Sequence, residues 1–154
     1  MTALTIHATN ITGLGACQVV SSFLRGLESL DTKYSKIECY VPDNGPLSNY
    51  LPNSSKFKII KFRRLGPKFL TRFLECIFPN YFFNLGDDLI VLGDVPLRTS
   101  ARQLVLIQQA HLQKPRVNSF VDRSIVFRGM RALTKINAPF ADYSCRISTV
   151  YLLM

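Results

Sequence analysis

The chain reads ALTIHATNITGLGA over residues 3–16, and this stretch decides the fold class. Its first six residues predict a buried strand, which leads through a turn with Gly13 and Gly15 into a helix that opens at Ala16. A strand, a glycine turn and a helix in this order form the first crossover of a parallel α/β sheet. The free N–H groups of such a helix can bind phosphate or sugar hydroxyls at the carboxyl end of the strand.

The length and composition indicate a single globular domain. The chain has 154 residues, of which 47% are hydrophobic and 19% are charged, which is ordinary for a domain with its own core. Its 19 Lys and Arg residues against 10 Asp and Glu residues give a net charge of +9. Such a charge attracts nucleic acid, anionic lipid headgroups or phosphorylated small molecules, and the charge alone does not choose among them.

The cysteines and the apolar runs argue against a zinc site, a secreted protein and a membrane span. The four cysteines are spaced too widely for a zinc motif, so we expect no metal site. The predicted first strand begins almost at Met1, which leaves no room for a signal peptide and predicts a cytoplasmic location. No stretch approaches the ~20 consecutive apolar residues that a membrane span needs.

Hydrophobic periodicity predicts helices and strands in alternation. The expected helices cover residues 16–30, 67–78 and about 119–135, and the expected strands cover residues 3–8, 37–41, 56–62, 88–93 and 103–108. Partial alternation places strand 56–62 near the sheet edge, whereas continuous apolar runs make 88–93 and 103–108 central strands. We therefore predict an α/β fold, a Rossmann-like, doubly wound, mostly parallel sheet with flanking helices, whose ligands bind outside the carboxyl ends of the strands.

The glycine turn lacks one feature of the dinucleotide-binding fingerprint. The third glycine would stand at position 18, which is occupied by Gln18. A nicotinamide or flavin site is therefore disfavoured, and we expect no cofactor. Two interpretations of Gly13 and Gly15 stay open: they make a tight turn, or they let a substrate approach the backbone at the N-terminus of the first helix.

Three polar residues lie where predicted strands end. His7 belongs to the first strand, Asp94 follows residues 88–93, and His111 follows residues 103–108. A histidine at a strand end can orient a sugar hydroxyl or share a proton, and an aspartate there can bind a hydroxyl. The alternatives are hydrogen-bonded strand-end residues for the histidines and a loop-capping aspartate for Asp94.

Basic and aromatic residues are interleaved over residues 56–83. Residues 56–72 hold seven basic side chains and no acidic one, beside six aromatic residues at 69–83. The helix predicted at 67–78 either lies on an anionic membrane or, as is more common, packs its apolar face on the sheet and shows its basic residues to water. The residues expected to face a membrane are Lys61, Arg63, Arg64, Lys68 and Arg72. A second basic run, at 114–135, marks a solvated helix face or a phosphate site.

Three of these segments together resemble a known family. They are the strand that leads into Thr12–Gly15, the strand 89–93 followed by Asp94–Pro96, and the strand 104–108 followed by His111 and Leu112. Their combination resembles the N-terminal domain of a retaining GT-B glycosyltransferase of the group 1 type. The resemblance covers residues 3–142, as one Rossmann-like domain that is half of a GT-B fold, and leaves 143–154 as an atypical C-terminal tail.

The resemblance implies a function. In that family two Rossmann-like domains face each other across a cleft, and the N-terminal domain holds mainly the acceptor, here a glycan or a lipid-linked molecule. The C-terminal domain holds the nucleotide sugar, which is a co-substrate. The resemblance implies that Gly13 and Gly15 lie near the donor diphosphate and that His111 lies near the transferred sugar, as the catalytic residue. His7 and Asp94 complete the expected substrate-binding set, and the basic and aromatic face would dock on the inner face of the membrane.

The sequence departs from the family after Ala138–Asp142. The family continues with another buried strand and a donor-binding domain, whereas Tyr143–Thr149 reads poorly as that strand. We therefore expect a truncated product, or one half of a split enzyme that is inactive without a separate donor-domain chain. The alternatives are a stand-alone basic module for anionic lipid or nucleic acid, although no nucleic-acid motif is recognised, and a small complete Rossmann-like enzyme, which the missing glycine argues against.

Overall fold

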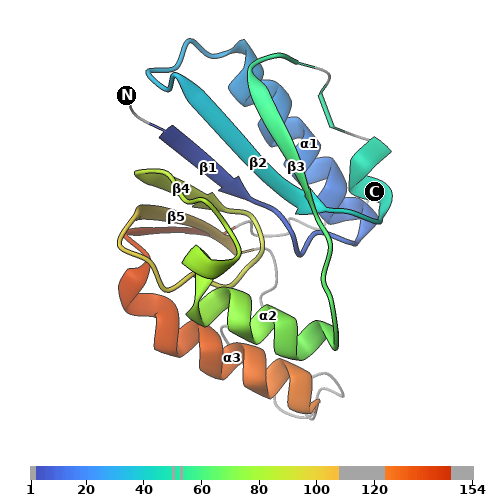
Figure 1. The fold of residues 1–154 in the computed structure, drawn as a ribbon, viewed down its shortest axis with the longest axis vertical. Helices are drawn as coiled ribbons and strands as arrows, with labels where there is room; N and C mark the ends of the chain where they lie inside the picture. The colour runs from blue at the N-terminus through green and yellow to red at the C-terminus, as the bar shows by residue number, and fades with distance from the viewer. Residues whose placement is uncertain (1–2, 50, 53, 108–123, 147–154) are drawn as a thin grey trace, which may run out of the picture.

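A computed structural model describes residues 3–49, 51–52, 54–107 and 124–146. They form one α/β domain around a parallel sheet of six strands in the order β3-β2-β1-β4-β5-β6 (Figure 1). The strands are β1 (Ala3–His7), β2 (Lys36–Pro42), β3 (Phe57–Phe62), β4 (Asp88–Val91), β5 (Arg102–Ile107) and β6 (Tyr143–Arg146). The helices are α1 (Leu14–Ser29), α2 (Lys68–Ile77) and α3 (Ile125–Asn137).

The strand order makes the sheet doubly wound. From β1 the chain moves outward to β2 and β3, and it then returns to β4 on the other side of β1 before moving out to β5 and β6. The predicted Rossmann-like α/β fold is therefore confirmed. The strand at the edge, β3, is the one whose alternation predicted an edge position, and β4 lies in the centre between β1 and β5.

Each face of the sheet has its own apolar core, because side chains alternate along a strand. On one face Leu4 and Ile6 of β1 pack with Val20 and Leu24 of α1. On the other face α2 and α3, which lie side by side in Figure 1, pack over β4 and β5. His7 points to this second face, where its ring lies 4.8 Å from that of Phe83, centroid to centroid. The end of β1 therefore places a titratable side chain beneath α2.

The sixth strand corrects the expected domain boundary. Tyr143–Arg146 pairs in parallel with β5, with Tyr143 opposite Leu104, so the expectation that 143–154 is a tail outside the domain is wrong for these four residues. An edge strand is held by backbone pairing and needs no run of apolar residues. Asp142 fixes the start of this strand, because its carboxylate accepts a hydrogen bond of 2.6 Å from the Gln103 backbone N–H. Residues 147–154 lie outside the described residues.

The helix bounds differ modestly from those predicted. The first helix begins at Leu14, two residues earlier than expected, and α3 is described only from Ile125 onward, since 119–123 lie outside the described residues. Of the helices that the structure describes, none has the length and apolar character needed to cross a bilayer.

Candidate functional site

The carboxyl edge of the sheet between β1 and β4 is the switch point of the fold, where ligands bind in open α/β sheets. The loop that follows β1 and the loop that follows β4 are in close contact. The Leu92 N–H donates to the His7 carbonyl at 2.9 Å, and a Cβ built on Gly93 would lie 3.3 Å from the Asn10 Cβ. Gly93 therefore allows the β4 loop to approach the loop between β1 and α1.

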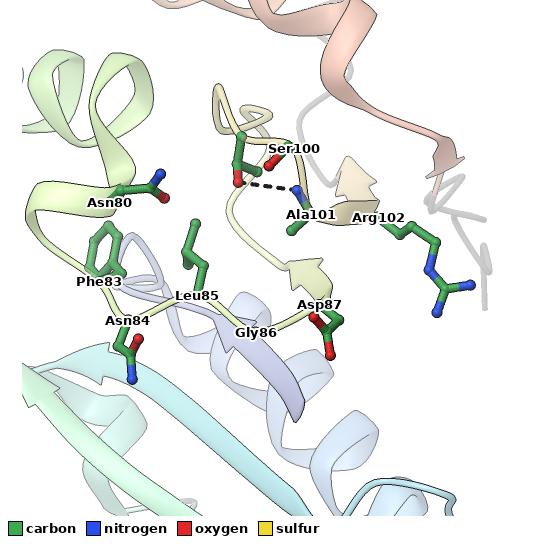
Figure 2. A pocket seen from close by; sticks show the side chains of 10 residues that line it. Asn80, Phe83, Asn84, Leu85, Gly86, Asp87, Ser100, Ala101 and Arg102 are labelled. Carbon is green, nitrogen blue, oxygen red and sulfur yellow. Dashed lines mark hydrogen bonds between the residues drawn. The ribbon is translucent and has the colours of Figure 1, made fainter. Parts of the chain in front are cut away.

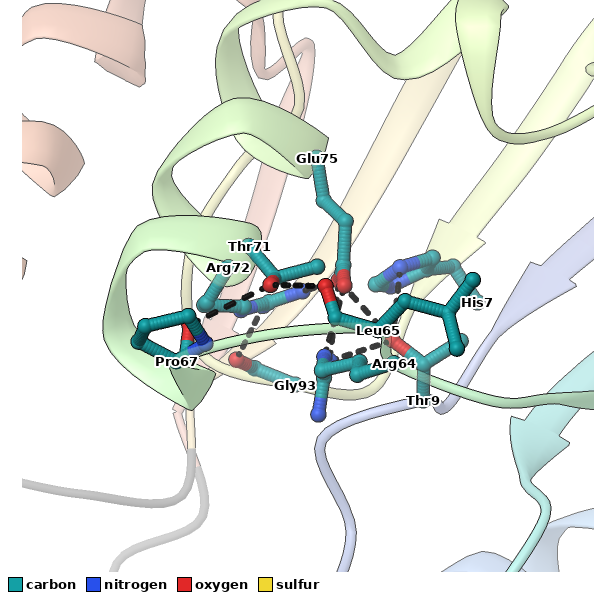
Figure 3. A network of polar contacts seen from close by, with 9 residues as sticks. All are labelled: His7, Thr9, Arg64, Leu65, Pro67, Thr71, Arg72, Glu75 and Gly93. Carbon is teal, nitrogen blue, oxygen red and sulfur yellow. Dashed lines mark hydrogen bonds and ion pairs between the residues drawn. The ribbon is translucent and has the colours of Figure 1, made fainter.

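A buried carboxylate lies at this edge and is held by two arginines (Figure 3). Glu75 of α2 has no exposed surface. Arg64 lies in the segment between β3 and α2. It donates two hydrogen bonds to this carboxylate, from Nε to Oε1 at 2.6 Å and from Nη2 to Oε2 at 2.8 Å. Arg72 adds a weaker contact at 3.4 Å. The two short parallel bonds form a bidentate pair, the strongest kind of arginine and carboxylate contact.

Thr9 connects this ion pair to the end of β1. Its hydroxyl oxygen accepts a hydrogen bond of 3.0 Å from Arg64 Nη2 and lies 3.1 Å from His7 Nε2 and 3.4 Å from Glu75 Oε2. A hydroxyl has one hydrogen to donate. The arrangement that satisfies the three groups has His7 Nε2 donating to Thr9, whose hydroxyl donates to Glu75. His7 Nδ1 then carries a lone pair, for which the described residues offer no hydrogen-bond partner.

Burial and the two arginines keep His7 neutral. Loss of hydration lowers the pKa of the fully buried His7 well below 6.5, and the positive charges of Arg72 and Arg64 lower it further. His7 is therefore a fully buried, neutral imidazole. This matches the alternative of a hydrogen-bonded strand-end residue, and with no exposed surface His7 does not contact a ligand directly in this structure.

Arg72 does not face outward, so its expected place on a membrane-facing surface is wrong. The residue is 3% exposed, and its Nη2 donates to the Gly93 carbonyl at 3.1 Å. Arg64 is also drawn inward by Glu75, and its side chain is 16% exposed. Of the other expected members, Lys61 and Arg63 are exposed, and the side chain of Lys68 lies outside the described part of the structure.

Arg72 is buried because the polar side of α2 faces the sheet, whereas its apolar side was expected to do so. Its buried residues are Thr71, Arg72, Glu75 and Cys76. Its exposed ones include Phe69, Leu70 and Phe73, at 40%, 53% and 40% exposure. The polar stripe thus faces the carboxyl edge of the sheet, while much of the aromatic stripe faces water or lies along α3.

The two glycines of the first turn lie in the open. Gly13 is the N-cap of α1 with an extended backbone, and a Cβ on Gly13 or Gly15 would meet no described atom within 4 Å. Neither residue has a positive φ, so the backbone conformation does not require glycine here. Among the described residues no side chain caps α1, and its first turn holds no acidic residue. The helix N-terminus is therefore accessible to an anion.

Asp94 lies within the described residues, whereas His111 does not. Asp94 follows Gly93 with a φ of 70° and is 5% exposed, an uncommon left-handed conformation that aspartate tolerates in loops. This fits the loop-capping alternative better than an exposed hydroxyl-binding carboxylate. His111, together with residues 114–123 of the second basic run, lies outside the described residues.

A pocket of about 430 Å³ lies at the opposite edge of the sheet (Figure 2). Asp87, just before β4, and Arg102, at the start of β5, line it together with Asn84 and Ser100. None of the expected site residues borders this pocket. Because parallel sheets bind ligands at their carboxyl edge, we place the candidate site at the switch point and not in this pocket. In the part of the chain that the structure describes, no cluster of three His, Cys, Asp or Glu side chains could hold a metal ion.

Thr9 and Glu75 were missed by the sequence analysis. Their contacts join positions 66 residues apart, which no local pattern reveals. One signal was present: Arg72 and Glu75 are three residues apart, about one helical turn, in a helix whose other side is apolar. A spaced pair of opposite charges there indicates a polar stripe as well as an apolar one.

No protein-family model, no curated protein and no solved structure matches the chain. The fold and the site define its class: a Rossmann-like α/β domain with a buried polar network at the switch point.

Proposed function

We propose that this domain is the acceptor-side half of a retaining GT-B glycosyltransferase, the family that its sequence resembles. The observation that carries the proposal is the open glycine turn at the N-terminus of α1. Gly13 and Gly15 are exposed at the carboxyl edge of β1, and a Cβ built on either glycine would meet no atom of the described residues within 4 Å. The described residues leave room there for a diphosphate to approach the first N–H groups of α1.

The proposed chemistry needs a second wall for the cleft. As a glycosyl group is transferred, negative charge develops on the leaving diphosphate, and cationic partners must stabilise it. In this proposal those partners belong to a donor-binding domain outside the 154 residues. This domain contributes the glycine turn and the acceptor surface, and His111 is proposed to lie near the transferred sugar. The domain alone would therefore not catalyse transfer.

A lipid-linked acceptor is favoured by one further observation. Around α2 a set of large apolar residues is exposed, which we call the α2 aromatic face. It consists of Leu65, Phe69, Leu70, Phe73, Phe78 and Tyr81, with 40% to 87% exposure. Exposed Lys61 and Arg63 precede it. Aromatic side chains beside basic ones suit the boundary of an anionic membrane. We therefore propose that the α2 aromatic face makes peripheral contact with such a membrane. The same contact would serve the alternative function, a stand-alone lipid-binding module.

The experiment mixes this chain with a separately produced donor domain of the same family and measures sugar transfer from a panel of nucleotide sugars. We expect transfer only in the mixture. Gly15→Leu should reduce it at least tenfold, because the new side chain covers the N-terminus of α1. Gly26→Leu is the matched control, since Gly26 also lies on α1 with open space around it. Transfer by this chain alone, or equal activity of the two variants, would contradict the proposal.

A further inference from the structure

One nitrogen of the Arg64 guanidinium group, Nη1, takes no part in the hydrogen bonds among Arg64, Glu75 and Thr9. Nε and Nη2 bind Glu75, and Nη2 also binds Thr9. Among the described residues, Nη1 makes no hydrogen bond, and Figure 3 shows this nitrogen pointing away from the network. The side chain keeps 16% of its surface exposed, so the unused N–H groups can be reached from solvent.

Glu75 holds this arginine ready for a ligand. A free arginine side chain loses much rotamer freedom when it binds, whereas a guanidinium already fixed by a bidentate carboxylate has little left to lose. Glu75 itself is completely buried, so it can orient Arg64 but cannot compete for the outer face. The arrangement presents a fixed cation at the carboxyl edge of the sheet.

The charges around Arg64 favour an anionic ligand. Arg64 and Arg72 share the single carboxylate of Glu75, so Glu75 neutralises only one of the two guanidinium charges. Thr9, which binds Arg64, belongs to the loop that ends at the N-terminus of α1. No described side chain caps this terminus, and the helix dipole adds positive potential there.

We propose that Arg64 binds a phosphate group through Nη1, with Glu75 as the residue that positions it. Arginine with a fixed planar fork is suited to phosphate oxygens. The site does not depend on glycosyl transfer, because a phosphate group can belong to a nucleotide, to a phosphorylated sugar or to a lipid headgroup. The ligand chemistry is the same in each case.

The test is an NMR titration of the full chain with inorganic phosphate at constant ionic strength, which follows the arginine side-chain N–H signals. We expect phosphate to shift the Arg64 signals and chloride not to shift them. Arg64→Lys keeps the charge but loses the fork, and it should weaken phosphate binding at least tenfold. Arg63→Lys is the matched control, with binding within about twofold of the natural chain.

Each outcome decides the proposal. If no arginine signal shifts in the natural chain, or chloride acts as phosphate does, the proposal is wrong even where Arg64→Lys fails to fold. Equal weakening by Arg63→Lys would also overturn it. Competition by a nucleoside diphosphate would identify a soluble source of the phosphate group, and competition by phosphatidylglycerol vesicles would identify a lipid source. Failure of the glycosyl-transfer assay would leave these results unchanged.

Discussion

Glu75 joins three parts of the chain at the carboxyl edge of the sheet. It lies on α2, it binds Arg64 from the segment before that helix, and through Thr9 it reaches the end of β1. A buried carboxylate has lost its hydration, and here the two guanidinium groups replace it. Loss of the negative charge would leave two cations together with no anion between them.

We therefore predict that Glu75→Gln lowers the free energy of unfolding by about 3 kcal/mol, the usual cost of removing one partner of a buried ion pair. Urea denaturation monitored by circular dichroism measures this value. Glu28→Gln is the matched control, because Glu28 is exposed on α1, and its change should stay within about 0.5 kcal/mol. Similar losses in both variants would show that the network does not stabilise the fold.

His7 gives the stability a pH dependence. Its pKa in the folded chain lies well below 6.5, chiefly because it is buried. The unfolded chain therefore takes up the proton first, and stability is complete above about pH 6.5 and falls as the pH is lowered through that value. The slope approaches about 1.4 kcal/mol per pH unit. The lowered pKa of Glu38 adds its own loss only below its ordinary value of 4.5.

Urea denaturation between pH 5 and 8 measures this slope. His7→Asn should flatten the curve in that range, whereas His111→Asn should leave the slope caused by His7 in place. A natural chain whose stability is constant from pH 8 to pH 5 would contradict a buried, neutral His7.

At the scale of single elements, the orientation of α2 is the main departure from expectation. Helical spacing predicted an apolar stripe correctly, but spacing does not tell which side of a helix faces the sheet. In the structure the polar stripe with Arg72 and Glu75 is buried, because Thr9, Arg64 and Gly93 satisfy it. Part of the aromatic stripe is left exposed as a result.

The α2 aromatic face can be tested on lipid vesicles. Leu65 and Tyr81 are its most exposed members, at 82% and 87%, so the double variant Leu65→Ser/Tyr81→Ser should barely change stability. We predict that it weakens sedimentation with phosphatidylglycerol vesicles several-fold, since apolar area inserted in the interface is lost. Leu30→Ser is the control, because Leu30 is 59% exposed at the end of α1. Equal binding by both variants would exclude this face as the contact.

The segment just before β4 passes very close to the backbone of β1 at Gly86. A Cβ on Gly86 would lie 2.5 Å from the Ala3 carbonyl oxygen, and backbone atoms of β1 cannot move aside cheaply. We predict that Gly86→Ala lowers the free energy of unfolding by about 1–3 kcal/mol, as measured by urea denaturation. Gly26→Ala, in open space on α1, should raise it by up to about 1 kcal/mol. A neutral Gly86→Ala would mean that this approach is looser than the structure shows.

At the scale of the whole molecule, the sheet could be predicted and the polar network could not. Apolar runs such as 88–93 identify strands, and their alternation with helices defines a parallel sheet, because both signals are local. The β6 strand was missed since Tyr143–Arg146 has no apolar run and is held by pairing with β5. The contacts of Glu75 with Thr9 depend on the three-dimensional arrangement of segments far apart in the chain.

We place the ligand-binding edge at the carboxyl ends of β1 and β4, although the structure also contains the polar pocket of Figure 2 at the opposite edge. The most direct test is a backbone amide NMR map of the chain with a nucleoside diphosphate. We predict shifts at Thr9, Gly13 and Gly15, at the N-terminus of α1. Shifts confined to Asp87 and Arg102, which line the pocket, would contradict the account and move the functional site to the amino edge of the sheet.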